Sequence, residues 1–544
     1  MKSCHSNVYG LRSAVFRLVP RRGRLKAAPA TFIRRLAIVA ALTWMPGAHA
    51  EAAPRVTTGI TAATELARVY DAILDARFED VPRLLEETCP PAPLEACRLL
   101  DAVALWWRIQ LDPLDTSRDR LFQTRVEAAL AAAEAWTKRE PERAEAWFYL
   151  GGAYGARVQW RVLRGEQLAA ARDGKRIKAA LERALTLDPG MQDAYFGIGL
   201  YHYYADVAPA AARLLRWLLA LPGGDRAKGL EQMQRAREHG RLLGGEADYQ
   251  LHVLYLWYED QPEQALALIQ GLRERHPQNP LFIQMAAEIE DHYLHDATAS
   301  LRTYKALLAT ARAGRIAEPG LAATTAHLGI ARELDRLFET DAALEHLQAV
   351  IDAAPASPHG AVARAQLQLG QALDRLGSRP EAIAAYRAAM AAAPPGDALQ
   401  IADRARAGLA RPPDAAAASA YRLSLEGWRA LERGALAEAA RAIAQSLALR
   451  PDDPVTQYRH ATLLLAQELE DEALVVFAGI HKRHEETPPT IYTRACVDAA
   501  RVHERLGAPD IAADLYRAAT TVFGGDRRAK DAARRHYARL RTQR

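Results

Sequence analysis

The spacing of small and aromatic residues ahead of proline constrains this chain more than any other feature. Ala382, Tyr386, Ala389 and Pro394 stand at intervals of four, three and five residues, and Leu369-Gly370 lies upstream on the preceding helical stretch. Small side chains on one helix face let a second, antiparallel helix approach closely before proline ends the pair. Alanine also precedes proline by twelve residues in two further frames: Tyr249, Ala265, Ile269, Leu272, Pro277 and Gly427, Ala439, Ile443, Ser446, Pro451.

These positions resemble the tetratricopeptide repeat (TPR), whose helix A carries an aromatic residue, a Leu-Gly pair and a tyrosine, and whose helix B carries Ala, Phe or Tyr, Ala and Pro. The resemblance covers much of residues 245–540 well and residues 140–240 loosely. It implies an all-α fold, an α-solenoid of stacked antiparallel helical hairpins with an irregular N-terminal half and an inner groove lined by the A helices. Such scaffolds bind other proteins and carry out no chemistry.

Composition agrees with an all-α chain. Half of the 544 residues are hydrophobic, which is ample for a continuous core, and long β-branched alternation is almost absent. We expect a signal peptide at 1–50, an irregular helical-hairpin region with TPR-like elements at 51–244 and a TPR array at 245–410. Two prolines in the linker 411–415 break any helix crossing it, and a second TPR array at 416–544 ends in a basic capping helix.

The N-terminus has the pattern of an export signal. Nine Lys or Arg and no Asp or Glu precede residue 51, and the apolar run from Leu36 to Ala48 leads into Ala48-His49-Ala50. This pattern predicts a signal peptide cleaved after Ala50 and a periplasmic or secreted protein. The run is short and is interrupted by proline and glycine, so an uncleaved membrane anchor is the weaker alternative. The basic segment is long, and translation could begin nearer Thr31.

Cleavage reverses the sign of the net charge. It removes nine of the 71 Lys and Arg residues and none of the 66 Asp and Glu residues, so the charge changes from +5 to −4. The mature chain therefore gives no support for a general affinity for nucleic acid. No other apolar run reaches the length of a transmembrane helix; the longest, Ala208 to Leu221, is broken by Arg213 and Arg216.

Three cysteines remain in the mature chain. Cys89 and Cys97 flank a proline-rich loop, and in an oxidising compartment they could form a disulfide; spacing alone leaves the free-thiol alternative open. Cys496 falls on a packing position of a helix A and is expected to be a small buried hydrophobe.

The sequence offers no complete set of catalytic, cofactor or metal-binding residues. Glu288, His292 and His295 share one helical face, which could chelate a metal but is more typical of a solvated helix. His481 and His484 come in the wrong order for a zinc-protease helix. Because phosphate-binding loops, nucleophile elbows and dinucleotide fingerprints are also missing, we expect no enzyme activity, no cofactor and no metal.

Aromatic residues are concentrated between residues 106 and 258. Two helix ends read alike, Leu-Tyr-His-Tyr-Tyr-Ala-Asp from Leu200 and Leu-Tyr-Leu-Trp-Tyr-Glu-Asp from Leu254. Tyr203, Tyr204, Trp257 and Tyr258 could therefore floor a groove for a protein or peptide partner. The favoured alternative is aromatic packing within the core.

The leading functional hypothesis is an exported adaptor that mediates protein–protein interaction in an envelope-associated complex. The runner-up is an all-α glycan-binding or glycan-active protein, for which paired carboxylates would be needed. Candidates are Asp112, Glu134, Asp260 and Glu288, but nothing in the sequence places two of them together. A third hypothesis is attachment to an anionic surface through Asp526 to Arg544, which holds eight cations; the preferred role of that helix is to cap the solenoid.

Overall fold

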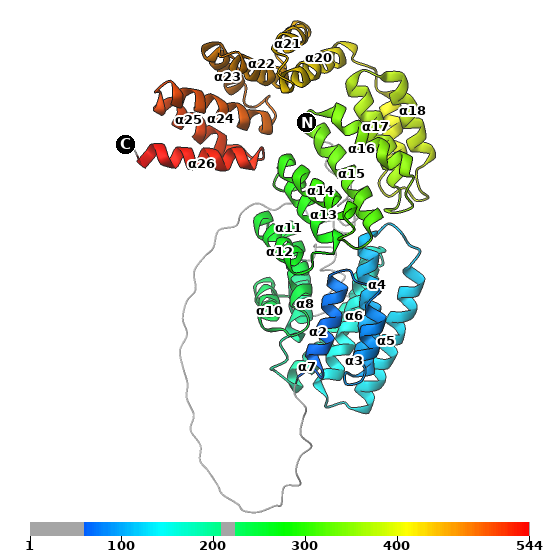
Figure 1. Cartoon of the computed structure of the whole chain (residues 1–544). Coiled ribbons are helices and arrows are strands. Elements are labelled where there is room, and N and C mark those ends of the chain that lie inside the picture. The colour runs from blue at the N-terminus through cyan, green and yellow to red at the C-terminus, as the bar shows by residue number, and fades with distance from the viewer. Residues whose placement is uncertain (1–58, 208–222, 543–544) are drawn as a thin grey trace, which may run out of the picture.

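A computed structural model describes residues 59–207 and 223–542, and these residues form 24 α-helices and no strand. The chain is an α-solenoid of stacked helical hairpins (Figure 1). The expected signal peptide at 1–50 and the expected helix from Ala208 to Leu221 lie outside the described residues. None of the described helices is long and apolar enough to cross a lipid bilayer.

The N-terminal bundle starts the described chain and is followed by a single connecting helix, α10 (Arg226–His239). Asp225 caps α10, because its carboxylate accepts a hydrogen bond from the Lys228 backbone N–H at 3.0 Å. The bundle consists of α2 (Ala63–Leu74), α3 (Val81–Thr88), α4 (Leu94–Leu111), α5 (Asp119–Arg139), α6 (Ala144–Leu163), α7 (Gln167–Leu187) and α8 (Ala194–Val207).

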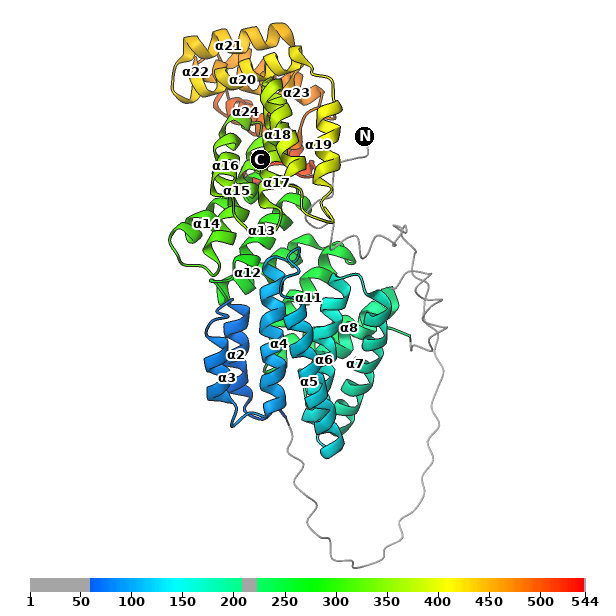
Figure 2. The ribbon, with the colours of Figure 1, turned by 90° about the vertical axis from the view of Figure 1, so that its right-hand side faces the viewer.

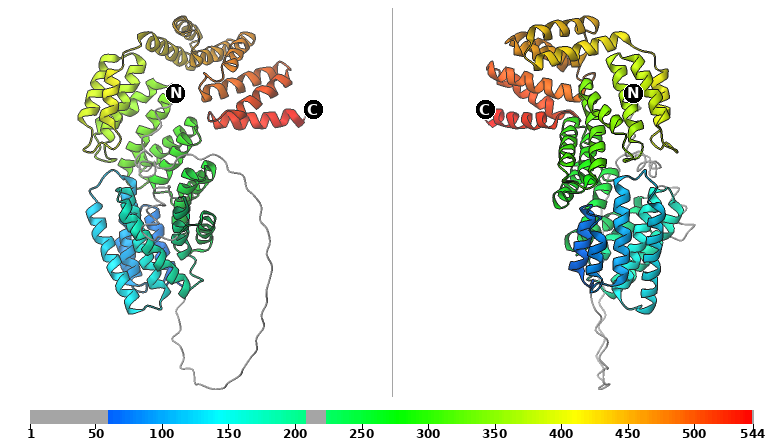
Figure 3. Two further views of the ribbon diagram at one scale, coloured as in Figure 1. Left: turned by 180° about the vertical axis from the view of Figure 1, so that it is seen from behind. Right: turned by 45° about the vertical axis from the view of Figure 1, so that its right-hand side comes forward.

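The repeat array follows as consecutive hairpins that curve round above the bundle (Figures 2 and 3). It consists of α11 (Gly244–Trp257), α12 (Pro262–Arg275), α13 (Pro280–His292), α14 (Ala297–Arg312), α15 (Pro319–Arg336), α16 (Thr340–Ala353), α17 (Ala361–Leu376), α18 (Arg379–Ala391), α19 (Ile401–Ala410), α20 (Ala415–Glu432), α21 (Leu436–Leu449), α22 (Pro454–Ala466), α23 (Glu470–Lys482), α24 (Pro489–Arg505), α25 (Pro509–Thr521) and α26 (Arg527–Thr542).

Prolines mark the starts of the array's helices as well as the ends of its hairpins. Six helices (α12, α13, α15, α22, α24 and α25) begin with proline, where a missing backbone N–H costs no intrahelical hydrogen bond. Within each hairpin the predicted frame residues are buried, as Ala382, Tyr386 and Ala389 show. The frame therefore identifies the packing face correctly.

Glycine on helix A makes room for the aromatic residue of helix B. A Cβ atom on Gly370 would lie 2.7 Å from the Tyr386 ring, and one on Gly329 would lie 2.6 Å from the Tyr304 ring. Real side chains do not approach this closely, so any larger residue would push the paired helices apart. This contact is the physical reason for the Leu-Gly pair in the sequence pattern.

Side-chain packing continues across the region boundaries that the sequence suggested. One hydrophobic core runs from Leu66 in α2 to Leu321 in α15, across the expected boundary at 244/245. Residues 411–414 separate α19 from α20, which already begins at Ala415, and Asp414 caps α20 at the Ala417 backbone N–H. However, α20 also packs on α17, so the helices on the two sides of the linker are in contact.

The two ends of the array from α13 to α26 meet at a seam, which we define as the contact of residues 293–298 with residues 523–527 and Arg494. The Gly525 backbone N–H donates to the His295 carbonyl at 3.1 Å, and the His295 and Phe523 rings lie 4.9 Å apart. Arg494 on α24 donates to the Thr298 hydroxyl at 3.2 Å. The array is therefore a closed ring, with α24–α26 returning to the α13–α14 turn (Figures 1 and 3).

Candidate functional site

The aromatic residues predicted to floor a groove lie largely inside the protein. Tyr203 is fully buried, and its ring meets those of Tyr204 and Tyr258 edge to face, at centroid distances of 5.8 and 5.7 Å. Tyr204 and Tyr258 meet in the same way at 5.8 Å. Edge-to-face clusters of this kind stabilise packed interiors. Tyr203 therefore belongs to the core, the favoured alternative, and cannot line an open groove.

The polar ends of this aromatic group hold neighbouring helices together. The Tyr203 hydroxyl donates to Glu259, which also pairs with Arg226 of α10 at 2.7 Å. The Trp257 indole N–H donates to the Tyr293 hydroxyl at 2.9 Å and so links α11 to the end of α13. Burial raises the pKa of Tyr203, which therefore stays protonated at neutral pH. These contacts give the group a structural role.

Two of the four carboxylates considered for glycan chemistry lie where the bundle meets the array. Asp112, at the end of α4, accepts hydrogen bonds from the Ser357 hydroxyl at 2.9 Å and the His359 backbone N–H at 2.8 Å. Asp112 and Glu288 both raise the pKa of the Arg364 guanidinium, against the larger lowering effect of burial. These carboxylates therefore join segments that are far apart in the sequence.

The other two carboxylates lie elsewhere. Glu134 on α5 accepts a hydrogen bond from the Tyr154 hydroxyl at 2.7 Å. Asp260 lies in the α11–α12 turn with a positive φ of 55°. Glu134 is therefore paired within the bundle, and Asp260 belongs to a turn of the array. The geometry therefore lends the glycan hypothesis no specific support.

The helix face with Glu288, His292 and His295 is not the solvated face that the sequence suggested. Glu288 is buried, and the neighbouring Asp291 is fully buried, where it pairs with Arg332 at 3.3 Å and with His292 at 3.1 Å. These side chains are buried because α13 packs against both α4 of the bundle and α15. His295 lies in the seam instead. Among residues 59–207 and 223–542, no three His, Cys, Asp or Glu side chains are grouped to hold a metal ion.

The inner side of the array is partly filled by the α15–α16 turn, residues 335–341. The Thr340 and Tyr421 hydroxyls lie 2.8 Å apart, and Asp341 pairs with Arg429 of α20 at 2.8 Å. Arg459 of α22 donates to the Phe338 carbonyl at 2.6 Å. The A helices α20 and α22 therefore contact their own chain, where the sequence predicted an open inner groove.

An accessible groove lies instead between α23 and α25, over α24. It has a volume of about 740 Å³. Its apolar lining consists of Leu474, Phe477, Ala478, Ala499, Ile511, Leu515 and Ala518, and its polar lining of His481, Lys482, His503, Asp514, Arg517 and Thr521. Of the large hydrophobic side chains that are exposed in the described part of the chain, Ile511 lines this groove, at 50% exposure. We call this surface the α23–α25 groove.

Side-chain contacts show in which direction the helices that form the α23–α25 groove run. Arg505, at the end of α24, donates to Glu470, at the start of α23, at 3.1 Å. At the opposite end, the Tyr492 hydroxyl and His481 Nδ1 lie 2.9 Å apart. These two contacts show that α24 runs antiparallel to α23. Because α24 and α25 form the next antiparallel hairpin, α23 and α25 run parallel.

The charge of the α23–α25 groove changes along its length. The first turn of α23 contains Glu470, Asp471 and Glu472, and the first turn of α25 contains Asp510. Towards the other end of the helices lie Lys482 and Arg517, of which Arg517 also pairs with Asp514 at 3.1 Å. Burial lowers the pKa of His481 and of His503, so both imidazoles are neutral at pH 7. Lys482 and Arg517 therefore line one end of the groove, and the carboxylates that begin α23 and α25 lie beyond its lining at the other end.

The sequence carried a signal for this groove that the repeat frame obscured. On α25 the buried residues of the repeat pattern are Ala512, Tyr516 and Ala519. Each of them is directly preceded by another apolar residue, namely Ile511, Leu515 and Ala518. The helices α18 and α21 have Glu381 and Glu438 where α25 has Ile511. A second apolar stripe beside the frame indicates a second contact surface.

Two other predicted features take structural positions. The helix α26 lays Ala533 and Leu540 against α24 and α25, with Ala529 and Tyr537 beside them, as a cap would. Its Arg539 pairs with Glu504 of α24 at 2.6 Å. Cys89 and Cys97 are joined by a disulfide with Cα atoms 6.5 Å apart, and Cys496 is buried.

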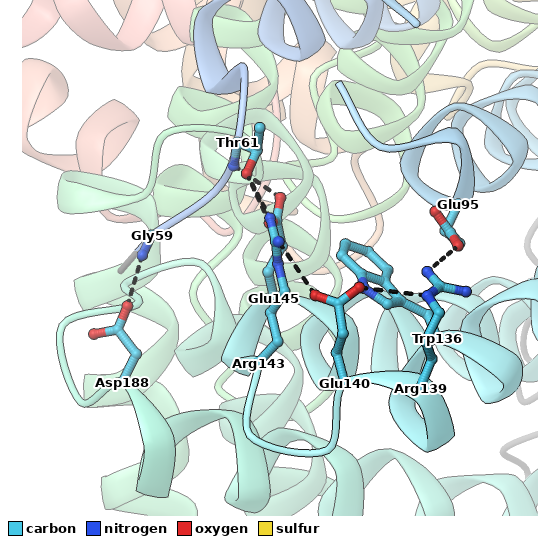
Figure 4. Close-up of polar contacts among 9 residues, drawn as sticks. All are labelled: Gly59, Thr61, Glu95, Trp136, Arg139, Glu140, Arg143, Glu145 and Asp188. Atoms are coloured by element: carbon cyan, nitrogen blue, oxygen red, sulfur yellow. Dashed lines mark hydrogen bonds and ion pairs between the residues drawn. The ribbon is translucent and has the colours of Figure 1, made fainter. Parts of the chain in front are cut away.

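The start of the described chain is anchored to one end of the bundle (Figure 4). The Gly59 backbone N–H donates to Asp188 at 2.9 Å, and Thr61 donates to both oxygens of Glu145 at 2.8 Å. Arg143 donates to Glu145 at 2.7 Å and to the Thr61 hydroxyl at 3.0 Å. Gly59 and Thr61 are therefore held against the end of α7 and the start of α6 (Figure 4).

Comparison with known proteins supports the repeat assignment. Residues 363–395, the α17–α18 hairpin, match the family model of the tetratricopeptide repeat. The sequence has no significant match among curated proteins.

Several solved structures are similar over most of their length, at low identity. The TPR domain of P58(IPK) is 13% identical, covers 82% of this chain and 98% of that one, and gives a TM-score of 0.22. A Rap protein in complex with competence and sporulation factor is 14% identical, with coverages of 89% and 99% and a TM-score of 0.21. Yeast Tom70 is 12% identical, with coverages of 89% and 96% and a TM-score of 0.24. Sequence identities and TM-scores this low carry no information about the partners of this chain.

Proposed function

We propose that this TPR solenoid is an exported, non-catalytic scaffold that holds a partner protein of an envelope-associated complex in the α23–α25 groove. The observation that carries the proposal is the apolar lining of that groove beside half-exposed Ile511. A concave, mainly apolar groove with a few polar groups at its edges is the usual form of a binding site. A protein partner also agrees with the charge of −4 for the chain after residue 50, which disfavours nucleic acid.

Export is part of the same proposal and has its own test. The basic and apolar segments before Ala50 support it, and the disulfide between Cys89 and Cys97 suits an oxidising compartment. N-terminal sequencing of the native protein should find Glu51 first, in the periplasmic or secreted fraction. Recovery of the protein from the cytosol, or with residues before Ala40 retained, would contradict export.

Site-specific photo-cross-linking tests the groove in the full chain. A benzophenone amino acid replaces Thr521, which is exposed and lines the groove, or Ala538, which is exposed on α26 outside it. After irradiation of intact cells, we expect a discrete cross-linked species from position 521 and none from position 538.

Two glutamate substitutions show whether that species depends on the groove. Ile511→Glu places a charge on the apolar lining and should abolish the cross-link. The matched control Leu449→Glu alters a side chain that is 48% exposed on α21 and should leave it intact. Cross-linking that survives Ile511→Glu, or that arises equally from position 538, would exclude the groove as the binding surface.

A further inference from the structure

The walls of the α23–α25 groove favour a helical occupant. Both walls and the floor are α-helices, whose backbone N–H and C=O groups are already hydrogen-bonded within each helix. An extended peptide would therefore find no backbone partners in the groove, whereas a helix satisfies its own backbone groups. The two walls are 13 residues each, about 20 Å at 1.5 Å per residue, which is enough for three to four turns of a bound helix.

The charges along the groove determine which way such a helix would run. Asp471 and Glu472 lie beyond the lining at the end where α23 begins, next to the Glu470–Arg505 pair, and Lys482 lines the end where α23 finishes. Helices commonly carry acidic residues in the first turn and basic residues in the last, because these complement the helix dipole. A helix of this kind matches the groove only when its first turn lies beside Lys482 and Arg517.

Helix dipoles favour the same direction. The parallel helices α23 and α25 both place their C-terminal ends, which carry partial negative charge, at the Lys482 end of the groove. A third helix between them is stabilised when its N-terminal end, with partial positive charge, lies there. The apolar positions Leu474, Ala478, Ile511 and Leu515 then face the apolar stripe of the bound helix.

We propose that the partner segment is an amphipathic α-helix of about three turns, with an acidic first turn and a basic last turn, bound antiparallel to α23 and α25. This inference rests on the proposed function and adds the chemistry and direction of the partner segment.

Two synthetic peptides test the direction. Both have one apolar stripe at helical spacing and identical composition; the first has an acidic N-terminal turn and a basic C-terminal turn, and the second has these charges exchanged. Fluorescence anisotropy with the full mature chain should show the first peptide binding about fivefold more tightly, because several charge pairs and the dipoles contribute. The difference should shrink as salt is raised.

Charge reversal in the protein provides the internal control. The double variant Lys482→Glu, Arg517→Glu changes two side chains at the basic end that are exposed, so the fold is retained, and it should abolish or invert the preference. The control double variant Arg422→Glu, Arg433→Glu changes exposed arginines on and after α20, outside the groove, and should leave the preference unchanged.

The outcomes separate this inference from the proposed function. Equal binding of the two peptides, or preference for the exchanged one, would overturn the direction while leaving the groove as a contact surface. Binding of neither peptide would overturn the helical occupant. Peptide binding that is insensitive to Ile511→Glu would place the peptide elsewhere and overturn the inference, whereas the cross-linking at position 521 decides the proposed function independently.

Discussion

Asp296 accepts a hydrogen bond from the backbone N–H of Arg527, 231 residues further along the chain, at 3.2 Å. Its other oxygen accepts from the Ala299 backbone N–H at 2.9 Å and caps α14, whereas α26 has its own cap in Asp526, which accepts from the Ala529 backbone N–H at 3.2 Å. Asp296 is almost fully buried, and burial together with Asp526 raises its pKa. Asp296 therefore joins two helix starts across the seam, beside the Gly525–His295 and Arg494–Thr298 contacts.

Replacing Asp296 should open the seam. Asp296→Ala removes the cap of α14 and the contact with the Arg527 backbone N–H, and it should lower the free energy of unfolding by about 1–3 kcal/mol. The control Asp414→Ala removes the cap of α20 alone and should cost about 1 kcal/mol. Denaturant unfolding measures both, and small-angle scattering should show expansion only for Asp296→Ala. Equal costs without expansion would mean that the seam contributes nothing to closure.

The close approach of the helices in the α17–α18 hairpin predicts that an alanine at Gly370 destabilises the protein. The Tyr386 ring lies between Gly370 and Gly408, and the Tyr386 hydroxyl donates to Asp374 at 2.8 Å, so the ring cannot move aside. Gly370→Ala should therefore destabilise the protein by about 1–3 kcal/mol.

The matched control lies on α23. A Cβ atom on Gly479 would meet nothing within 4 Å, so Gly479→Ala should stabilise the protein by about 0.5–1 kcal/mol through helix propensity. Thermal unfolding compares the two variants directly. Stabilisation by both would show that the ring can move away from position 370.

Glu246 makes stability depend on pH. This carboxylate is buried, accepts from the Tyr70 hydroxyl at 2.8 Å and makes weaker contacts with two glutamine amides, and burial raises its pKa. A carboxyl group with a raised folded-state pKa binds its proton more tightly when folded. Burial of the Glu246 carboxylate therefore destabilises the folded protein above that pKa. This effect disappears below about 4.3, which is the pKa of a glutamate side chain in the unfolded chain.

Glu246→Gln should accordingly raise the melting temperature at pH 7.5, with a difference that narrows as the pH approaches about 4. Glu438→Gln, at an exposed ion pair with Arg433, is the surface control and should change little at either pH. A lower melting temperature for Glu246→Gln at every pH would mean that its hydrogen bonds compensate fully for burial of the charge.

The disulfide between Cys89 and Cys97 should be present in a purified chain that starts at residue 51 and so lacks Cys4. Alkylation without reductant should modify no thiol in the folded chain, because Cys496 is buried, and one thiol after unfolding. Loss of the disulfide through Cys89→Ala, Cys97→Ala should destabilise the protein by about 2–3 kcal/mol through the freed loop. Two further modified thiols in the unfolded wild-type protein would show that the disulfide does not form.

The sequence predicted the hairpins well because their determinants are local. The twelve-residue step from alanine to proline, the Gly370 contact and the Asp225 cap all depend on residues within one or two helices. The seam and the filled inner side were not predictable, since they follow from small rotations summed over many repeats. Asp296 and Phe338 have no local pattern that identifies their distant partners.

The sequence left the aromatic site undecided because one pattern fits two environments. Tyr and Trp at a helix end suit a groove floor and a core equally, and only the positions of α8, α10 and α11 place Tyr203 in the core. The α23–α25 groove was overlooked for the opposite reason. Ile511, Leu515 and Ala518 stand next to stronger frame residues, so their apolar character was attributed to the frame.

Closure of the array at Asp296 changes how its repeats can come apart. A linear stack of repeats frays from its free ends, since a terminal repeat has only one neighbour. In this array the last hairpins and α26 have a second neighbour in the α13–α14 turn, so they cannot detach without also breaking the seam. Unfolding from α13 to α26 should therefore be more cooperative than in an open stack, and amide protons of α26 should exchange as slowly as those in the middle of the array.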